Sequence, residues 1–483
     1  MTGEMMEYDV VIIGGGIYGC LCARELSKYR VSVLVVEKAS DIGEGATKAN
    51  SGVLYAGFHP RGGSLKGRSC AAGNAMHRQL CSELDVPMEY TGSLFVAFHE
   101  EGIRTIRDKM DKGRKNGVPE MKMITGDQAR KLEPGLSQEV KAAMYCPTTG
   151  IISPFKLVMA AAENAAKNGV NLRFNTEIQS IAAEGDGYVL RGAGEEIRGK
   201  YVINAAGEES AIIEGLVRER DLVIKPRRGE YLVFDAPSPI KHVIYQAQED
   251  GEKGTLMAPT TDGQLLVGPT SDNPKGSHCT QTTKEGIDHI SFVAKKIMPG
   301  LDMGKVIATF AGVRANIVNV PKEEKDFVIR RSAPGFISML GIKNPGLTAS
   351  PYLVKKMVEL LFEEGMPKEE NPDFDPIHRF PVPFLRTTPE EQAAMMKKDR
   401  SYLNLICRCE NITEGDVLRQ LKSHLPPRNL NGLKKRMRVG MGRCQGGFCT
   451  PHLIEIMSRE LEKEPFEICK GDGGSNLVKG RLR

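Results

Sequence analysis

The sequence contains no tryptophan, and although its net charge is +5, no aromatic-and-basic patch accompanies that charge. It therefore lacks the side-chain combination that single-stranded nucleic acids require, and we expect no nucleic acid among its partners. No apolar run reaches the ~20 residues that span a membrane. The N-terminus has neither a basic region nor a cleavage site, which argues against a signal peptide and favours a cytoplasmic protein.

The length and composition are those of a multidomain globular protein. A chain of 483 residues predicts about three domains, and 40% hydrophobic with 26% charged residues is ordinary for a folded chain. Eleven cysteines without an export signal indicate reduced thiols in a reducing compartment. Residues 401–483 carry fifteen Lys or Arg and nine Asp or Glu, a charge of +6, so the rest sums to −1. Such a segment either attracts an acidic redox partner or is a solvated face.

The first motif is a glycine-rich turn at residues 14–19, Gly-Gly-Gly-Ile-Tyr-Gly. It follows an apolar run at 8–13, which predicts a parallel strand buried on both faces, and it opens a segment with helical spacing of apolar residues. The next predicted strand, 31–36, ends at Glu37, 23 residues after Gly14. This context is typical of a dinucleotide cradle, whereas a glycine turn without a ligand needs no acid at that point.

Each residue of the cradle has a physical role. Gly14 would make the tight turn, and Gly16 would let backbone amides approach a pyrophosphate at the positive end of the helix. Gly19 would let the helix pack closely on the strand, and Glu37 would accept hydrogen bonds from a ribose.

NAD and FAD share this cradle, so the choice depends on the segments that follow. A loop of small residues at 43–57 is longer than a nicotinamide domain needs and suits a stretch lying along a flavin. Further small-residue approaches occur at 204–207 and 341–348, and three discontinuous contacts fit FAD. The residues expected to bind it are Gly14, Gly16, Gly19, Glu37, Lys38, Thr47, Asn50, Ser51, Gly52, Ile178, Ala206, Gly207, Gly341, Gly346, Leu347 and Thr348.

Four cysteines form two close pairs near the C-terminus: Cys407 with Cys409, and Cys444 with Cys449. Glycines around the second pair would let its loop wrap closely around a metal centre. Four thiolates are the usual ligands of a [2Fe-2S] cluster, and they also suit structural zinc. The residue types alone leave both centres open. The basic run at 434–438 would either offset the negative charge of a cluster or face solvent.

Several stretches resemble the D-amino-acid-oxidase-like superfamily of FAD enzymes. The resemblance is strongest to bacterial anaerobic-type, FAD-dependent glycerol-3-phosphate dehydrogenases with a fused C-terminal iron–sulfur domain, and it covers nearly the whole chain. The cysteine segment is similar to the bacterioferritin-associated-ferredoxin-like domain, which favours [2Fe-2S] over zinc. The stretches that carry the first resemblance are 49–53, 63–68, 91–94, 150–154, 226–231, 311–314 and 345–348.

The resemblance implies an α/β fold in three parts. A Rossmann-like FAD-binding domain would carry an antiparallel β substrate cap, followed by a small α-helical [2Fe-2S]-binding domain. The β-branched residues and turns between 225 and 275 also favour an antiparallel sheet. Six prolines between 367 and 389 favour an extended linker over a packed helix. The expected bounds are 1–84, 151–222 and 306–366 for the FAD-binding domain, 85–150 and 223–305 for the cap, 367–399 for the linker and 400–483 for the [2Fe-2S]-binding domain.

The same resemblance assigns residues to the substrate. Arg314 occupies the Gly-x-Arg position that in the family binds a phosphate or carboxylate, and its guanidinium suits either anion. His59 follows the flavin-side loop and would contact phosphate, act as the catalytic base or serve the structure alone. Tyr55 stands where many relatives have histidine, which leaves the identity of the base open. Further candidate anion contacts are Lys66, Arg68, Arg227 and Arg228.

These features predict a dehydrogenase that acts on a CH–OH group. The resemblance implies oxidation of sn-glycerol 3-phosphate to dihydroxyacetone phosphate, with electrons passing from FAD through a [2Fe-2S] cluster to an acceptor. The alternatives are an L-2-hydroxyglutarate dehydrogenase, an amine- or imino-acid-oxidising enzyme, and an electron-transfer flavoprotein subunit. The resemblance also implies flavin or iron–sulfur subunits as electron-accepting partners. A peripheral membrane association would arise through those partners.

Overall fold

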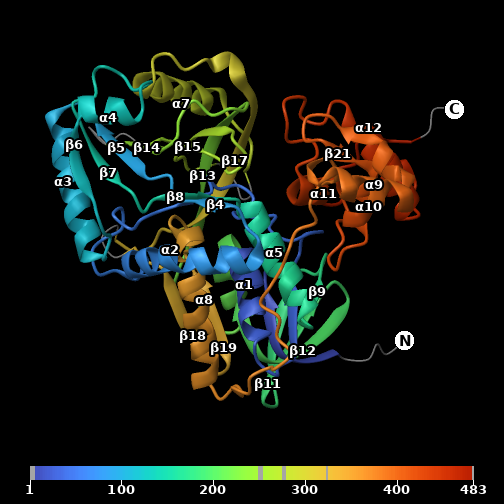
Figure 1. Ribbon diagram of the computed structural model, residues 1–483. Helices are drawn as coiled ribbons and strands as arrows, with labels where there is room; N and C mark the ends of the chain where they lie inside the picture. Colours follow the sequence, from blue (N-terminus) through green and yellow to red (C-terminus); the bar gives the residue numbers. More distant parts are fainter. Residues whose placement is uncertain (1–5, 248–253, 275–278, 322–324, 481–483) are drawn as a thin grey trace.

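The computed structural model describes residues 6–247, 254–274, 279–321 and 325–480, which form three parts (Figure 1). We call them the parallel-sheet domain, the cap and the cysteine module. The chain enters the cap twice and returns to the parallel-sheet domain each time before it reaches the cysteine module, so segments distant in sequence meet at the boundary between domain and cap.

The parallel-sheet domain is built on five parallel strands in the order β19-β12-β1-β2-β9. The apolar run of β1 is buried because its alternate residues enter hydrophobic clusters on opposite faces of the sheet. Three further strands extend the sheet in antiparallel pairings. The bounds are β1 Met6–Ile13, β2 Val33–Val36, β9 Asn171–Arg173, β10 Ser180–Glu184, β11 Gly187–Gly192, β12 Glu195–Asn204, β18 Val328–Ala333 and β19 Phe336–Leu340.

Helices α1, α5 and α8 cover one face of this sheet and share its largest hydrophobic cluster. Helix α2 packs along α8, and a small three-stranded sheet, β3-β8-β4, joins the domain to the cap. The bounds are α1 Ile17–Leu26, α2 Leu65–Leu84, α5 Pro154–Lys167, η1 Gly207–Glu209, α6 Ser210–Glu214, α8 Gly346–Glu363, β3 Val53–Leu54, β4 Met88–Glu89 and β8 Gly150–Ile152.

The cap is an eight-stranded sheet in the order β17-β13-β16-β15-β14-β5-β7-β6, antiparallel except for the β14–β5 pair. Helix α7 packs on one face and α3 on the other. The bounds are β5 Ser93–Ala97, α3 Glu100–Lys115, β6 Lys122–Thr125, α4 Gly126–Leu132, β7 Ala142–Cys146, β13 Ile224–Phe234, β14 Val243–Gln246, β15 Leu256–Pro259, β16 Leu265–Gly268, α7 Lys284–Ile297, η2 Met303–Lys305 and β17 Val306–Ile317.

The cysteine module has its own hydrophobic core and lies beside α5 and the cap, drawn in orange to red in Figure 1. Its main helices α10, α11 and α12 surround the two-stranded sheet β20-β21, in agreement with the small helical domain that the sequence predicts. The bounds are η5 Arg400–Leu403, β20 Leu405–Cys407, β21 Ile412–Thr413, α10 Glu414–Leu421, α11 Leu430–Met437, α12 Cys449–Glu460 and η6 Pro465–Glu467.

Two expected boundaries differ from the structure. Strand β17 pairs with β13 along its whole length, so residues 306–317 belong to the cap, and the last piece of the parallel-sheet domain begins with β18. The linker is not extended throughout, because it ends in η4 (Phe384–Arg386) and α9 (Pro389–Lys398). Thr388 forms a capping box with Glu391, and Pro389 occupies the first turn, where its missing N–H costs nothing.

Candidate functional site

The turn between β1 and α1 brings backbone close to backbone. A Cβ on Gly14, whose φ is +108°, would lie 2.6 Å from the Ala205 carbonyl oxygen, and one on Gly19 would lie 1.9 Å from the Gly14 oxygen. The fold itself therefore requires these two glycines. Gly16 differs, because its φ is −77° and a Cβ there would meet nothing closer than Thr47 Oγ1 at 3.5 Å. Its bare backbone leaves the N-terminus of α1 accessible to a ligand, as a pyrophosphate cradle requires.

The acid and the hydroxyl expected for the cradle both contact the turn. The Glu37 carboxylate accepts hydrogen bonds from Gly15 N at 2.6 Å and Ala39 N at 2.8 Å, and burial raises the pKa of Glu37. Thr47 Oγ1 accepts a hydrogen bond from Ile17 N at 3.1 Å. Lys38 points elsewhere, because its Nζ lies 2.5 Å from Glu209.

The other expected FAD contacts gather around this turn. Asn50 donates to Thr47 O and accepts from Gly52 N, which shapes the small-residue loop. Ala206 lies behind Gly14, and Tyr18 of α1 donates to Gly346 O at 2.7 Å, so all three expected approaches meet near the start of α1. The remaining residues of the set support the backbone: Ile178 is buried against the sheet, Gly207 and Gly341 have positive φ, Leu347 packs on the core and Thr348 Oγ1 accepts from Tyr55 N.

We expect Gly16→Ala to fold but to lose much of its FAD. The added methyl group meets only Thr47 within the protein, whereas it projects where a pyrophosphate would lie. Flavin absorbance per protein after purification measures occupancy, and the melting temperature reports folding. Gly45→Ala is the matched control, because a Cβ at Gly45 has no described atom within 4 Å. Equal FAD content in both variants would contradict the assignment of this turn.

Strands β13 and β17 place arginines on the inner face of the cap. Arg227 and Arg314 are direct partners across the two strands, so their side chains share one face of the sheet. Arg314 Nη2 donates to Arg228 O at 2.8 Å and to Thr270 O at 2.7 Å, which fixes the guanidinium. A Cβ on Gly312, also on this face, would lie 2.5 Å from Ala49, so the small-residue loop passes directly over the strand.

Lys343 completes a cluster of cations that the sequence reasoning did not single out. Its Nζ donates to Asn316 Oδ1 at 2.6 Å, two residues beyond Arg314 on β17. Burial lowers the pKa of Lys343 to about 8, and the charged neighbours that lower it further are cations. Burial and repulsion disfavour the charged form of Lys343, and an anion bound among these cations would stabilise it. These neighbours are Lys66, Lys325, Arg227 and Arg314.

Tyr55 belongs to the small-residue loop and lies close to this cation cluster. Its hydroxyl is within hydrogen-bonding range of Asn344 and Ser51, and Ser51 also reaches Tyr231. Burial raises the pKa of Tyr55, so its phenol remains protonated at neutral pH. Tyr55 therefore acts here as a hydrogen-bond donor or acceptor, and the charge of Arg314 lies close enough to influence it.

His59 stands behind Tyr55 in an aromatic cluster with Phe58, Phe95 and Tyr245. Burial lowers the pKa of His59 to about 3, with a smaller contribution from Lys109, so its imidazole is neutral at physiological pH. Its Nδ1 and the Tyr245 hydroxyl are both buried without a hydrogen-bond partner among the described residues, and the two ring centres lie 5.1 Å apart. Buried polar atoms of this kind call for a partner from outside the chain.

Two of the predicted anion contacts, Arg228 and Arg68, have other partners, whereas Lys66 joins the cation cluster. Arg228 projects to the opposite face of β13 from Arg227 and pairs with buried Glu230 at 3.1 Å, so it does not meet the expected anion. Arg68 is exposed and donates to Gly63 O. Lys66 is buried, donates to Lys325 O at 3.2 Å and contributes its charge to the cluster around Lys343. The period of two along a strand separates Arg227 from Arg228.

The four cysteines of the module meet as two pairs in space. Each pair joins one cysteine of the first loop to one cysteine of the second loop. Cys409 Sγ lies 3.6 Å from Cys444 Sγ, and the buried Cys407 thiol is hydrogen-bonded to Cys449, which lowers the pKa of Cys407 to about 6. A Cβ on Gly442 would lie 2.3 Å from that of Cys409, so glycine is required where the loops meet. Backbone N–H groups also point at the sulfurs, including Phe448 N toward Cys444, where it lowers the pKa.

This donor set fits a two-iron cluster better than zinc. Structural zinc draws four thiolates around one point, whereas a [2Fe-2S] cluster spreads four thiolates over two irons. Within the described ranges no three His, Cys, Asp or Glu side chains converge on one metal-sized site, and the thiols stand in pairs. Backbone N–H groups directed at the sulfurs would stabilise the thiolates that hold the cluster.

The module docks on the parallel-sheet domain through buried charges. Arg436 binds Asp41 at 2.6 and 3.0 Å, and Lys435 donates to Ile42 O at 2.7 Å and pairs with Glu44. Burial would raise the pKa of Asp41, but the guanidinium of Arg436 holds it below its ordinary value. The module therefore sits on the loop that leads from Glu37 to Thr47.

Asp41→Asn is expected to lower the free energy of unfolding of the module by about 3–5 kcal/mol, since it leaves the buried Arg436 guanidinium without the carboxylate to which it is hydrogen-bonded. Urea unfolding, followed by the absorbance of the cluster, measures the change. The control is Asp472→Asn, which removes an exposed carboxylate bound to Ser40 at the same interface and should cost less than about 1 kcal/mol. An equal loss in both variants would contradict this account of docking.

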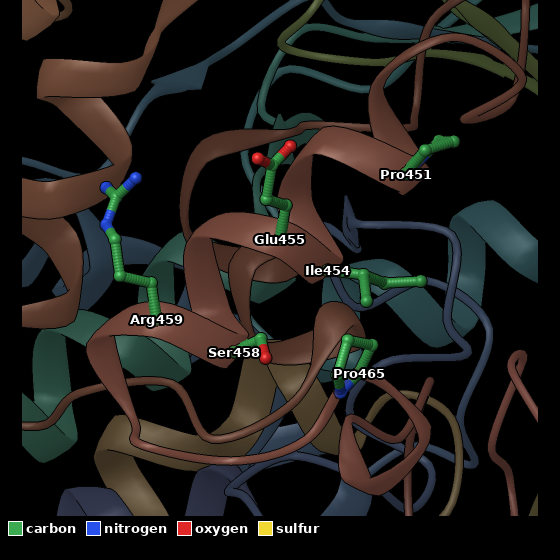
Figure 2. A pocket seen from close by; sticks show the side chains of 6 residues that line it. All are labelled: Pro451, Ile454, Glu455, Ser458, Arg459 and Pro465. Atoms are coloured by element: carbon green, nitrogen blue, oxygen red, sulfur yellow. The ribbon is translucent and has the colours of Figure 1, made fainter. Parts of the chain in front are cut away.

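A hollow of ≈ 370 Å³ lies on the outer side of the module, along α12 (Figure 2). Its charged groups are Glu455 and Arg459, and Arg459 is engaged by Glu414 and Glu460. It contains no nucleophile with an adjacent base, so it is not the catalytic centre. In the described part of the chain, no helix has both the length and the apolar character needed to cross a bilayer.

Comparison with known proteins agrees with this arrangement. A family model described as "FAD dependent oxidoreductase" matches residues 9–360, and one described as "BFD-like [2Fe-2S] binding domain" matches residues 405–459. The cradle thus lies within the first match and the four cysteines within the second.

Individual relatives cover most of the chain. It is 38% identical over 477 residues to "Glycerol 3-phosphate dehydrogenase" of Caloramator mitchellensis, covering 98% of each chain. It is 23% identical over 506 residues to "Anaerobic glycerol-3-phosphate dehydrogenase subunit A1" of Haloferax volcanii, covering 94% of this chain and 83% of the relative. Its fold is similar to that of the FAD-bound L-alpha-glycerophosphate oxidase from Mycoplasma pneumoniae, with a TM-score of 0.73, 27% identity and coverage of 78% and 100%.

Proposed function

The chain belongs to the FAD-dependent oxidoreductase family, and we propose that it oxidises sn-glycerol 3-phosphate to dihydroxyacetone phosphate. Each turnover removes two electrons and two protons from the substrate. The electrons pass through FAD and a [2Fe-2S] cluster of the module to a separate acceptor. The similarity over the full length to a glycerol 3-phosphate dehydrogenase supports both the substrate and the fused module.

The observation that carries the substrate assignment is the cation cluster around Lys343. A phosphate monoester carries close to two negative charges at neutral pH, so it would relieve the repulsion among these cations. Arg314 presents a fixed guanidinium, whose fork suits phosphate oxygens. Lys343 adds a point charge from the opposite element, the loop before α8. Arg227 and Lys66 stand behind them in the same cluster.

The residues around Tyr55 would position the reacting end of the substrate. Bound FAD accepts the two electrons, and the bound cluster passes them on singly. The phosphate contacts hold the substrate so that its carbinol carbon is fixed in one orientation. The Tyr55 hydroxyl donates to, or accepts from, the substrate hydroxyls. The neutral His59 Nδ1 and the Tyr245 hydroxyl lack other partners among the described residues, and we assign His59 Nδ1 to accept a hydrogen bond from a substrate hydroxyl.

The FAD assignment rests on the cradle and its neighbours. Gly16 would admit the pyrophosphate to the N-terminus of α1, and Glu37 would accept hydrogen bonds from a ribose hydroxyl. Thr47 and the loop that contains Asn50 and Ser51 would lie along the phosphate and ribitol. Backbone at Gly346 and Thr348 would approach the flavin ring, since Thr348 also binds Tyr55 N at 3.0 Å.

The electron acceptor would be a further protein subunit. The name of the Haloferax volcanii relative describes one subunit of an anaerobic enzyme, which supports partner subunits for this chain. A flavin or iron–sulfur subunit could accept single electrons from the cluster. Any membrane association would then be peripheral and would come through that partner.

The value of kcat/KM for sn-glycerol 3-phosphate should fall as the pH rises through about 8, because the Lys343 amine of the free enzyme loses its charge there. Lys343→Arg keeps its charge above pH 8, so its profile should lack this fall.

The free energy of unfolding should instead increase as the pH rises through the same range. Between pH 8 and 10.5 the unfolded chain holds the proton that the folded protein has released, so stability from this group increases with pH. Identical pH profiles of kcat/KM for the two proteins would contradict the role of Lys343.

The test is the flavin absorbance under anaerobic conditions. The holoprotein is mixed in parallel with sn-glycerol 3-phosphate, L-2-hydroxyglutarate or buffer. Rapid bleaching by the phosphate alone is the expected result. Bleaching by the hydroxy acid alone would transfer the function to a 2-hydroxy-acid dehydrogenase, whose carboxylate the same cations could hold. No bleaching by either compound would overturn both substrate assignments.

A further inference from the structure

One side of the cysteine module exposes its thiols. Cys407 and Cys449 are buried, at 2% and 1% of their full exposure, whereas Cys409 is exposed and Cys444 is half-buried. A cluster held by these four residues would therefore approach solvent on the side of Cys409 and Cys444. Electron transfer between proteins depends on short distances, so this side is where an electron would leave.

An aromatic side chain stands on this surface. Phe448, directly before Cys449, is 68% exposed, and the Arg408 guanidinium lies 6.0 Å from the centre of its ring. A large apolar ring held by a cation–π contact is an ordered, solvent-exposed contact point. Aromatic residues and arginine are enriched at the energetic centres of protein interfaces. Pro451, three residues later, lines the hollow along α12 (Figure 2).

The charge around the exposed thiols is positive. Arg408 and Arg443 are both exposed, and each is next to a cysteine of the motif. The acid beside them, Glu410, is engaged by Arg438 at 3.1 Å. From residue 441 to 452 the sequence has no Asp or Glu. The side that faces solvent therefore presents two cations without a local counterion in the sequence around them, within a segment whose net charge is +6.

We infer that Arg408, Arg443, Phe448 and the exposed thiols, together the redox face, dock an electron-carrier protein that presents an acidic surface. This inference rests on the proposed function, since it gives the cluster electrons to deliver. Opposite charges would steer the encounter, and Phe448 would pack against the partner once docked. Each encounter moves one electron: the reduced cluster is oxidised by one electron, and the one-electron centre of the carrier is reduced by one.

The test uses two protein acceptors of opposite charge, rubredoxin, which is acidic, and cytochrome c, which is basic. The holoprotein is reduced chemically with dithionite, freed of excess reductant and mixed with each acceptor at several ionic strengths. Because no substrate is needed, the result does not depend on the identity of the substrate. Flavin bleaching by sn-glycerol 3-phosphate, measured separately, tests the proposed function. Binding of zinc-substituted rubredoxin, which accepts no electron, gives a second readout independent of transfer.

The variants are Arg408→Glu/Arg443→Glu and Phe448→Ala, with Lys463→Glu as the matched control. Lys463 is exposed on the same module, beyond the other end of α12 and about 20 Å away along the helix axis. The double variant should reduce rubredoxin at least 10-fold more slowly at low salt and bind the zinc form correspondingly weakly. Phe448→Ala should weaken binding without changing its salt dependence. Lys463→Glu should behave as the wild type.

Two results would overturn the inference. One is a double variant that binds and reduces rubredoxin as the Lys463→Glu control does. The other is a wild-type protein whose reduction of rubredoxin does not slow as the ionic strength rises, since the redox face would then not attract an acidic partner by its charge. Absorbance of the cluster in every variant verifies that the metal centre is retained, because neither arginine nor Phe448 supplies a ligand thiol.

Discussion

Lys343→Met is expected to lower kcat/KM for sn-glycerol 3-phosphate by about 10- to 100-fold while the protein keeps its FAD. The substitution removes one charge from the cation cluster and preserves the volume of the side chain. A hydrogen bond to a charged group contributes about 1.5–3 kcal/mol, and 1.4 kcal/mol corresponds to tenfold. The loss should appear mainly in KM, because the phosphate is bound equally in the ground state and the transition state.

The control for this variant is Lys225→Met. Lys225 lies opposite Asn316 in the register of β13 and β17, but it is exposed and is not among the main causes of the lowered pKa of Lys343. Steady-state kinetics of both variants, with FAD content and melting temperature measured alongside, isolate the role of the charge. Removing the repulsion should also raise the melting temperature of Lys343→Met without substrate. A kcat/KM equal to that of Lys225→Met would exclude Lys343 from substrate binding.

Cys407→Ser is expected to abolish the cluster and with it all transfer to a protein acceptor, while sn-glycerol 3-phosphate still bleaches the flavin at the wild-type rate. Cys407 is buried, and backbone N–H groups of Gly440 and Glu410 point at its sulfur, so a serine hydroxyl there cannot supply an equivalent thiolate. Iron content, cluster absorbance and reduction of a protein acceptor are measured together.

Cys469→Ser provides the comparison, because Cys469 belongs to the same module and lies outside the two pairs. It should keep iron, absorbance and transfer. Retention of cluster absorbance in Cys407→Ser would remove Cys407 from the ligand set. Loss of flavin bleaching in that variant would mean that the module is needed for substrate oxidation itself.

The local motifs could be predicted from sequence because their physics is local. The turn at 14–19 requires glycine wherever backbone packs on backbone. The acid at the end of the next strand belongs to the same strand–turn–helix–strand unit and binds the turn. The residue type and spacing of the cysteine pairs predict a metal centre held by four thiolates. The comparisons confirmed the family, the α/β fold with its small terminal module, FAD and [2Fe-2S].

The substrate side was harder, because it depends on the register of strands distant in sequence. Arg227 and Arg228 are equivalent by composition, and only the pairing of Arg227 with Arg314 assigns them to opposite faces. Lys343 lies in the small-residue segment at 341–348, for which the sequence predicts a flavin contact and no substrate contact. Its partner, Asn316, lies on β17, which sequence reasoning had placed in the parallel-sheet domain. The helix α9 was missed because nearby prolines outweighed the Thr388 cap.

Tertiary contacts also redefine the linker. Residues from Asn371 to His378 bind the parallel-sheet domain through Asn164, Asn168 and Glu163, with His378 Nε2 at 2.8 Å from the Glu163 carboxylate. Spacing of prolines predicts extended backbone but not what it packs against. The module is therefore held at a fixed place beside the nucleotide loop, as electron transfer between two centres requires.

The central claim is that electrons from sn-glycerol 3-phosphate reach the flavin and then the cluster. Anaerobic rapid mixing of the holoprotein with this substrate, with flavin absorbance and the EPR signal of the reduced cluster recorded in the same samples, tests it directly. The account predicts that the flavin bleaches first and that the cluster signal follows in every molecule that carries both centres. A cluster that stays oxidised beside a fully bleached flavin, with no acceptor present, would contradict it.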